Sequence, residues 1–268
     1  MRAVHDAPIK SLDLYKQGLG KISESVWQDL ELEALNLAEN DLTSVPDEIG
    51  NLVNLTMLDL GHNKLRSLPE SLGKLHRLRF LYLSDNRLRA LPGSLWNLQS
   101  LVYLGITDNE FSSLPEALGK LTRLVELRLY NNQLTFLPDA IGQLSDLREL
   151  HVMRNRLTSL PDSIGRLKNL RKLGLEGNQI ESLPDSIGSM KHLTDLDLRN
   201  NKVRAVPASI GKLKRLRFLD LRANELTDLP TSLGDLQRLE KLDLRWNKSL
   251  RVPKWIMKLE QRGCLVYT

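Results

Sequence analysis

Asparagine recurs along this chain at a fixed step of 23 residues, ten times without a slip. The ten positions are Asn40, Asn63, Asn86, Asn109, Asn132, Asn155, Asn178, Asn201, Asn224 and Asn247. A sequence period of about 20–50 residues is typical of a stacked array, in which each unit buries its apolar face against its neighbours. We therefore expect one continuous array, although 268 residues would otherwise be long enough for two domains.

The first half of each unit predicts a strand followed by a turn. The units repeat the pattern LxxLxLxxNxLxxLPxxLxxL, as in the stretch from Leu78 to Leu98. The LxL alternation indicates a short strand with both leucines in the core and its other residues on the opposite face. The asparagine amide can donate and accept, so it is suited to bond backbone groups left unpaired at the turn. Stacked unit upon unit, these amides predict a hydrogen-bonded ladder.

The second half of the unit, LPxxIGxL, predicts a return along the other face of the array. We expect the proline to set the first turn of a short helix, and the acidic residue that often follows it to suit the helix N-terminus. We expect the glycine to end the segment. These glycines are Gly50, Gly73, Gly119, Gly142, Gly165, Gly188, Gly211 and Gly234.

The start of the chain departs from the repeat, as a terminal unit must in order to shield the array. Gln17 stands where asparagine is expected, and Ser23 and Trp27 take the places of proline and glycine. We interpret residues 1–31 as an N-terminal capping repeat.

The end of the chain departs from the repeat as well. After the array at residues 32–252, where Ser249–Leu250 shifts the expected leucine by one place, residues 253–268 predict a C-terminal cap. This cap is expected to hold a closing amphipathic helix and a last extended piece at Cys264–Tyr267.

The unit resembles the leucine-rich repeats of intracellular Ras-scaffold proteins, plant intracellular Ras-group-related proteins and the Scribble and Erbin type. Similar arrays occur free-standing in bacteria. The resemblance spans about residues 9–253. It implies a right-handed α/β solenoid, curved into a horseshoe, with a concave parallel sheet of about 11 strands and a convex face of short helical or 3-10 turns. It also implies a non-enzymatic protein-binding module, such as a signalling scaffold for a small GTPase, a kinase or a phosphatase complex.

Composition indicates which partners and which cellular compartment to expect for such a module. The net charge of +5 is modest for this length, so neither nucleic acid nor a membrane is the expected partner. Cys264 is the single cysteine, which excludes a disulfide framework within the chain and favours a reducing compartment. Residues 1–10 contain no apolar run that would indicate a signal peptide, and no apolar stretch has transmembrane length. We expect a cytoplasmic monomer.

The residues two, four and six places before each asparagine should line the concave face. These positions hold six of the chain's 13 aromatic residues. The six are Tyr15, Phe80, Tyr82, Tyr103, Tyr130 and Phe218. Strand propensity alone favours aromatic residues on such a face, so enrichment by itself has a structural explanation.

Clustering of these residues favours a binding role instead. Met57, Phe80 and Tyr103 follow one another in a single column, and Gly105 should leave a depression beside them. Aromatic residues, Met and Arg are enriched in protein interfaces and their hot spots. The predicted partner-binding residues are Met57, Phe80, Tyr82, Tyr103, Arg128, Tyr130, His151 and Met153.

The last repeats carry charge on the same face. Asp197, Asp220 and Asp243 form one column, and Arg199, Arg222 and Arg245 form the next. We expect these columns to pair into a lattice, since stacked like charges would otherwise repel. The alternative is a charged rim that steers a partner.

No catalytic or metal-binding pattern is evident. The histidines lie far apart, with no cysteine or carboxylate at metal-site spacing, and no phosphate-binding glycine motif occurs. His151 follows Glu149 and neighbours Arg128, but no nucleophile accompanies it. We therefore expect no enzyme activity, no metal and no cofactor. Two other functions stay open: a bacterial effector whose repeats recognise a host target, and a structural or idealised array without a natural ligand.

Substitution of a predicted core leucine or ladder asparagine should lower the free energy of unfolding. Leu129→Ala removes a predicted core side chain and should cost about 2–5 kcal/mol of unfolding free energy. Asn132→Ala should also be destabilising, because it leaves turn groups unpaired. Urea unfolding followed by circular dichroism measures both, and an unchanged midpoint in either variant would contradict the assignment of that residue to the scaffold.

Overall fold

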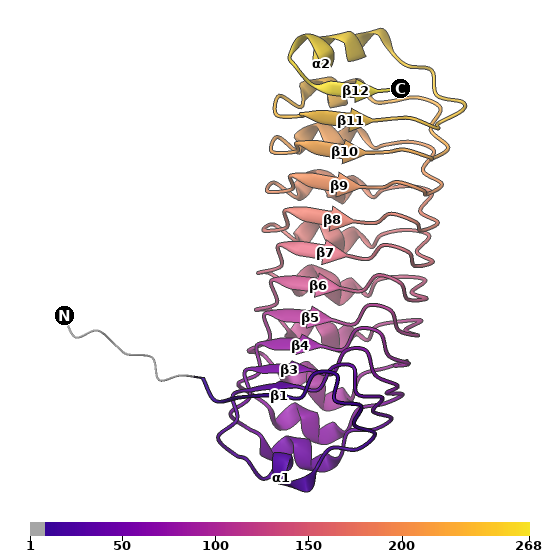
Figure 1. Ribbon diagram of the computed structural model, residues 1–268. Helices are drawn as coiled ribbons and strands as arrows, with labels where there is room; N and C mark the ends of the chain where they lie inside the picture. Colours follow the sequence, from indigo (N-terminus) through magenta and orange to yellow (C-terminus); the bar gives the residue numbers. More distant parts are fainter. Residues whose placement is uncertain (1–8) are drawn as a thin grey trace, which may run out of the picture.

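The computed structural model describes residues 9–268 as one stack of short coils (Figure 1). Each coil contributes a three-residue strand to a single open parallel sheet, whose strands lie in chain order. Figure 1 shows the strands along one side of the stack and the helical turns behind them. The expected curved solenoid with a concave parallel sheet is confirmed. The described residues contain 12 strands rather than about 11, because the extended piece at the end of the chain joins the sheet.

The register of the sheet follows the sequence period. Met57 pairs with Phe80, and Phe80 pairs with Tyr103, so partners lie 23 residues apart. The strands are β1 (Ser11–Asp13), β2 (Ala34–Asn36), β3 (Met57–Asp59), β4 (Phe80–Tyr82), β5 (Tyr103–Gly105), β6 (Glu126–Arg128), β7 (Glu149–His151), β8 (Lys172–Gly174), β9 (Asp195–Asp197), β10 (Phe218–Asp220), β11 (Lys241–Asp243) and β12 (Leu265–Tyr267).

The return segments are mostly 3-10 helices, and each begins directly after a proline in extended conformation, as at Pro46. They are η1 (Asp47–Asn51), η2 (Glu70–Lys74), η3 (Gly93–Asn97), η4 (Glu116–Lys120), η5 (Asp139–Gln143), η6 (Asp162–Arg166), η7 (Asp185–Ser189), η8 (Ala208–Lys212), η9 (Thr231–Asp235) and η10 (Lys254–Ile256). Two short α-helices, α1 (Glu24–Trp27) and α2 (Met257–Gln261), occur near the ends.

Each asparagine of the 23-residue series ties two coils together. The Asn63 amide donates to the carbonyl oxygens of Leu60 and Gly61 in its own coil and of Leu37 in the coil before, at 2.9–3.1 Å. Its oxygen accepts the backbone N–H of Leu42 at 2.9 Å. The side chain is therefore buried but fully bonded, as a buried amide must be.

The residue before each of these asparagines adopts a left-handed backbone. Its φ lies between +51° and +69° in all ten coils, and only Gly177 among the ten is a glycine. Ala223 and Trp246 adopt this conformation in spite of its steric cost. Sequence reasoning missed this position because the residue type there varies from coil to coil.

The glycines of the return segments have a different role from the expected one. They lie inside the 3-10 helices without a positive φ, so they do not end them. A Cβ on Gly142 would lie 2.4 Å from the Ser163 backbone oxygen of the next coil. Glycine is required there because the return segments of neighbouring coils stack in contact.

The ends of the stack differ from its middle. The first eight residues of the predicted N-terminal cap lie outside the described residues, and the rest of that cap contains β1 and α1. At the other end, Lys241 pairs with Leu265, one residue beyond the regular step, in agreement with the shift noted at Ser249–Leu250. The cap boundaries themselves stay predictions.

The close contact between neighbouring return segments predicts that alanine lowers stability at Gly142 but not at Gly234. Gly142→Ala places a methyl group against fixed backbone and should cost about 1–3 kcal/mol of stability. Gly234→Ala is the matched control, because its Cβ would meet only Trp255, at an ordinary 3.5 Å. That variant should be neutral or slightly more stable, since alanine restricts the unfolded chain. Equal melting temperatures for the two variants would contradict this explanation.

Candidate functional site

All eight predicted partner-binding residues lie on the concave face, on strands β3 to β7 or two residues beyond a strand end. Each is half-buried. Met57, Phe80 and Tyr103 are in register, and Arg128 pairs with His151 on the next strand pair. The structure thus brings the eight onto one face, and their role in binding stays a prediction.

Tyr82 and Tyr103 form the centre of this group. Their ring centroids are 4.7 Å apart at a 34° interplanar angle. The Arg128 guanidinium carbon lies 5.7 Å from the centre of the Tyr103 ring, within cation–π range. Arg128 Nε also donates to a Glu126 carboxylate oxygen at 2.5 Å. The cluster is therefore ordered by its own contacts before any partner arrives.

The depression expected at Gly105 is absent. A Cβ on Gly105 would lie 2.9 Å from the Tyr103 hydroxyl oxygen, so the Tyr103 ring fills the space above this glycine. Burial raises the pKa of Tyr103 to about 12. Burial also raises the pKa of Tyr82, and the Asp59 carboxylate adds to that shift.

A hollow of ≈ 450 Å³ lies farther along the sheet. Its lining includes Met153, Gly174 and Phe218. The Met153 sulfur covers Gly174 closely, 2.6 Å from where a Cβ would be. Sequence reasoning missed this hollow, although Gly174 occupies the same column as Gly105. The neighbouring side chains differ: the Tyr103 ring lies over Gly105, whereas the Lys172 side chain pairs with Glu149 on the next strand.

The charged columns form the expected lattice. Arg199 contacts Asp197 at 2.8 Å and Glu176 at 2.7 Å, and its Nε lies 3.7 Å from Asp220 on the next strand. Arg222 repeats the arrangement with Asp220 at 2.7 Å and Asp243 at 3.4 Å. These pairs satisfy one another across β9 to β11, as the self-paired interpretation predicts.

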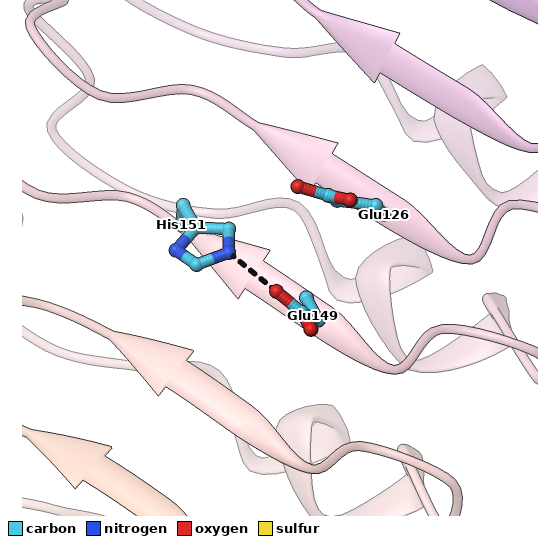
Figure 2. Close-up of side chains that lie close together, drawn as sticks. All are labelled: Glu126, Glu149 and His151. Atoms are coloured by element: carbon cyan, nitrogen blue, oxygen red, sulfur yellow. Dashed lines mark hydrogen bonds and ion pairs between the residues drawn. The ribbon is translucent and has the colours of Figure 1, made fainter.

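Glu126, Glu149 and His151 converge on β6 and β7 (Figure 2). His151 Nε2 lies 3.1 Å from a Glu149 carboxylate oxygen, and one ligand atom from each of the three residues lies within 4.8 Å of the others. Sequence reasoning missed this group because it considered spacing along the chain. The sheet places Glu126 directly opposite Glu149, one full repeat away.

Cations neutralise both carboxylates of this group. Lys172 Nζ lies 2.9 Å from Glu149, and Arg128 pairs with Glu126. Although burial opposes it, hydrogen bonding from Lys172 and His151 lowers the pKa of Glu149.

Comparison with known proteins identifies the repeat. A family model described as leucine-rich repeat region matches residues 70–173 and 160–217. A second, described as leucine rich repeat, matches residues 8–65, 30–88 and 191–248. The chain belongs to the leucine-rich repeat family. The finer resemblance to Ras-scaffold or Scribble and Erbin arrays is not settled by these matches. A comparison with curated proteins finds no match.

Solved structures of leucine-rich repeat proteins are similar to this chain. A plant peptide hormone receptor, RGFR1 in complex with RGF2, is 31% identical with a TM-score of 0.76, over 85% of this chain and 38% of the receptor chain. A Leptospira interrogans leucine-rich repeat protein is 28% identical with a TM-score of 0.52, over 98% of this chain and 96% of that one. InlJ from Listeria monocytogenes is 22% identical with a TM-score of 0.79, over 96% of this chain and 57% of that one, and supports the fold alone.

Within residues 9–268, no helix is long and apolar enough to span a lipid bilayer. Cys264 is a buried free thiol, and burial raises its pKa.

The half-buried Tyr103 side chain predicts a loss of stability at alkaline pH. Its pKa is raised from 10.0 to about 12 by folding. A raised pKa contributes stability that is present below the unfolded value and is lost as pH rises through the folded value. Absorbance titration of the wild type minus Tyr103→Phe should therefore show one tyrosinate transition near pH 12, and the unfolding free energy of the wild type should fall relative to that of Tyr103→Phe as pH rises from 10.0 to about 12. A difference transition near pH 10 would contradict the burial of this side chain.

Proposed function

We propose that this protein is a non-catalytic recognition module whose concave face binds a partner protein. The family it belongs to consists typically of protein-interaction modules. The observation that carries the proposal is the ordered cluster of Tyr82, Tyr103 and Arg128 on that face. Half-buried aromatic side chains held in place lose little conformational entropy on binding, and Tyr and Arg are the residues that dominate interface hot spots.

In this proposal the Tyr82, Tyr103 and Arg128 cluster provides affinity for the partner, and the charged lattice orients it. Met57, Phe80 and Tyr130 extend the apolar centre, while His151 and Met153 connect it to the hollow at Gly174. The paired charges that line the hollow would set the orientation of the partner rather than its affinity.

We further propose an intracellular signalling scaffold, a monomer in the cytoplasm, whose partner is a small GTPase or a kinase or phosphatase complex. The support is the repeat pattern, which resembles the intracellular Ras-group arrays, and the single cysteine. The effector alternative draws support from the bacterial protein that matches over nearly its whole length. The concave residues differ from coil to coil, which argues against an idealised array without a ligand.

Removal of the tyrosines should abolish partner capture. Tyr82→Ala, Tyr103→Ala and Tyr130→Ala are combined in one variant, and Phe136→Ala serves as the control, because this phenylalanine is exposed but lies outside the strands. Each hot-spot truncation should weaken binding about 30-fold. Proteins captured from lysate by the wild type are quantified by mass spectrometry.

Partners retained by Phe136→Ala and lost from the triple variant are the expected result. The melting temperature of the triple variant should stay close to that of the wild type. Equal capture by the wild type and a folded triple variant would contradict the proposed surface.

A further inference from the structure

We propose that Glu126, Glu149 and His151 form a binding site for a divalent transition-metal ion of the zinc type on the concave face. The inference does not rest on the proposed partner. Within residues 9–268, these are the three side chains with metal-binding atoms that converge in this way. Imidazole nitrogen with carboxylate oxygen is a donor set that zinc accepts in proteins.

The distances suit a small metal ion. Two ligands bound to tetrahedral zinc at about 2.0–2.1 Å lie roughly 3.3–3.4 Å apart. His151 Nε2 and the Glu149 oxygen are 3.1 Å apart, so an ion bridging them needs only a small adjustment. The third ligand atom, from Glu126, lies within 4.8 Å of both and has a flexible side chain with which to approach.

The sheet holds the donors on one side. Glu149 and His151 are two residues apart on β7, so they face the same way, and Glu126 is the direct partner of Glu149 on β6. Figure 2 shows all three side chains grouped above these neighbouring strands. Their side chains are 20–29% exposed, which leaves water access for the remaining coordination position.

The orientation of the His151 ring favours coordination through Nε2. That nitrogen faces Glu149, while Nδ1 lies 3.5 Å from where a Cβ of Gly174 would be. His151 and Gly174 both line the hollow, and the Nδ1 edge of the ring lies on the Gly174 side. It can carry the ring proton there with water as its acceptor, leaving the Nε2 lone pair for the metal.

Metal binding has to displace two cations. Lys172 and Arg128 now neutralise the carboxylates, and their side chains are 51% and 42% exposed, so both can move into solvent. Arg128 also has the Tyr103 ring as a second contact. This competition gives the site a distinctive property: removal of the Lys172 charge should strengthen metal binding, whereas removal of a ligand should weaken it.

The test is isothermal titration of the purified, tag-free chain with Zn²⁺. We expect one saturable site in the wild type. His151→Gln and Glu149→Gln should each weaken it at least about 10-fold. Lys172→Met should tighten it about fivefold, because a like charge next to the ion is removed.

His62→Asn is the matched control, since His62 pairs with Asp85 on an exposed turn and asparagine tolerates its positive φ. Its Zn²⁺ affinity should equal that of the wild type. Metal-free melting temperatures show that each variant is folded. The proposal is overturned if the wild type shows no saturable site, if His151→Gln binds as well as the wild type, or if Lys172→Met binds more weakly.

Discussion

The buried asparagine amide is the interaction on which the rest of this structure depends. After each strand from β2 to β11 the chain must turn inside the protein, where unpaired carbonyl and N–H groups are costly. One amide satisfies groups of two successive coils at once, as Asn63 does for Leu60 and Leu37. It therefore closes the turn and fixes the spacing of the coils together. The parallel sheet and the stacked return segments both follow from that spacing.

In a regular scaffold of this kind, one set of residues provides stability and a different set is free to provide recognition. The leucines and asparagines point into the stack, and the strand residues between them point outward. Outward residues such as Tyr82 and Glu126 can change without disturbing the core, so one face can carry an aromatic cluster and, farther along, a hollow lined by a lattice of ion pairs. These surfaces differ because the outward residues vary from coil to coil while the leucines and asparagines do not.

Features that repeat with the 23-residue period could be predicted from the sequence. Features that depend on which side chains lie next to each other on the sheet could not. The strands, the core and the pairing of Arg199 with Asp197 follow from residue type and a step of 23, so they could be derived by counting. Gly105 and Gly174 have the same place in the repeat, yet Gly174 lines a hollow while the Tyr103 ring lies over Gly105. The grouping of Glu126 with His151 likewise needs the sheet register, which joins residues of different repeats.

The constant register of the sheet also bears on how such a chain can change in length. Partners on successive strands stand 23 residues apart from β1 to β11, so every junction between these strands has the same register. Loss or duplication of one whole unit would leave the remaining junctions intact, so evolution can lengthen or shorten the recognition surface by recombination. The junction of β11 with β12 spans one residue more, so the final coil cannot be exchanged with those of the array.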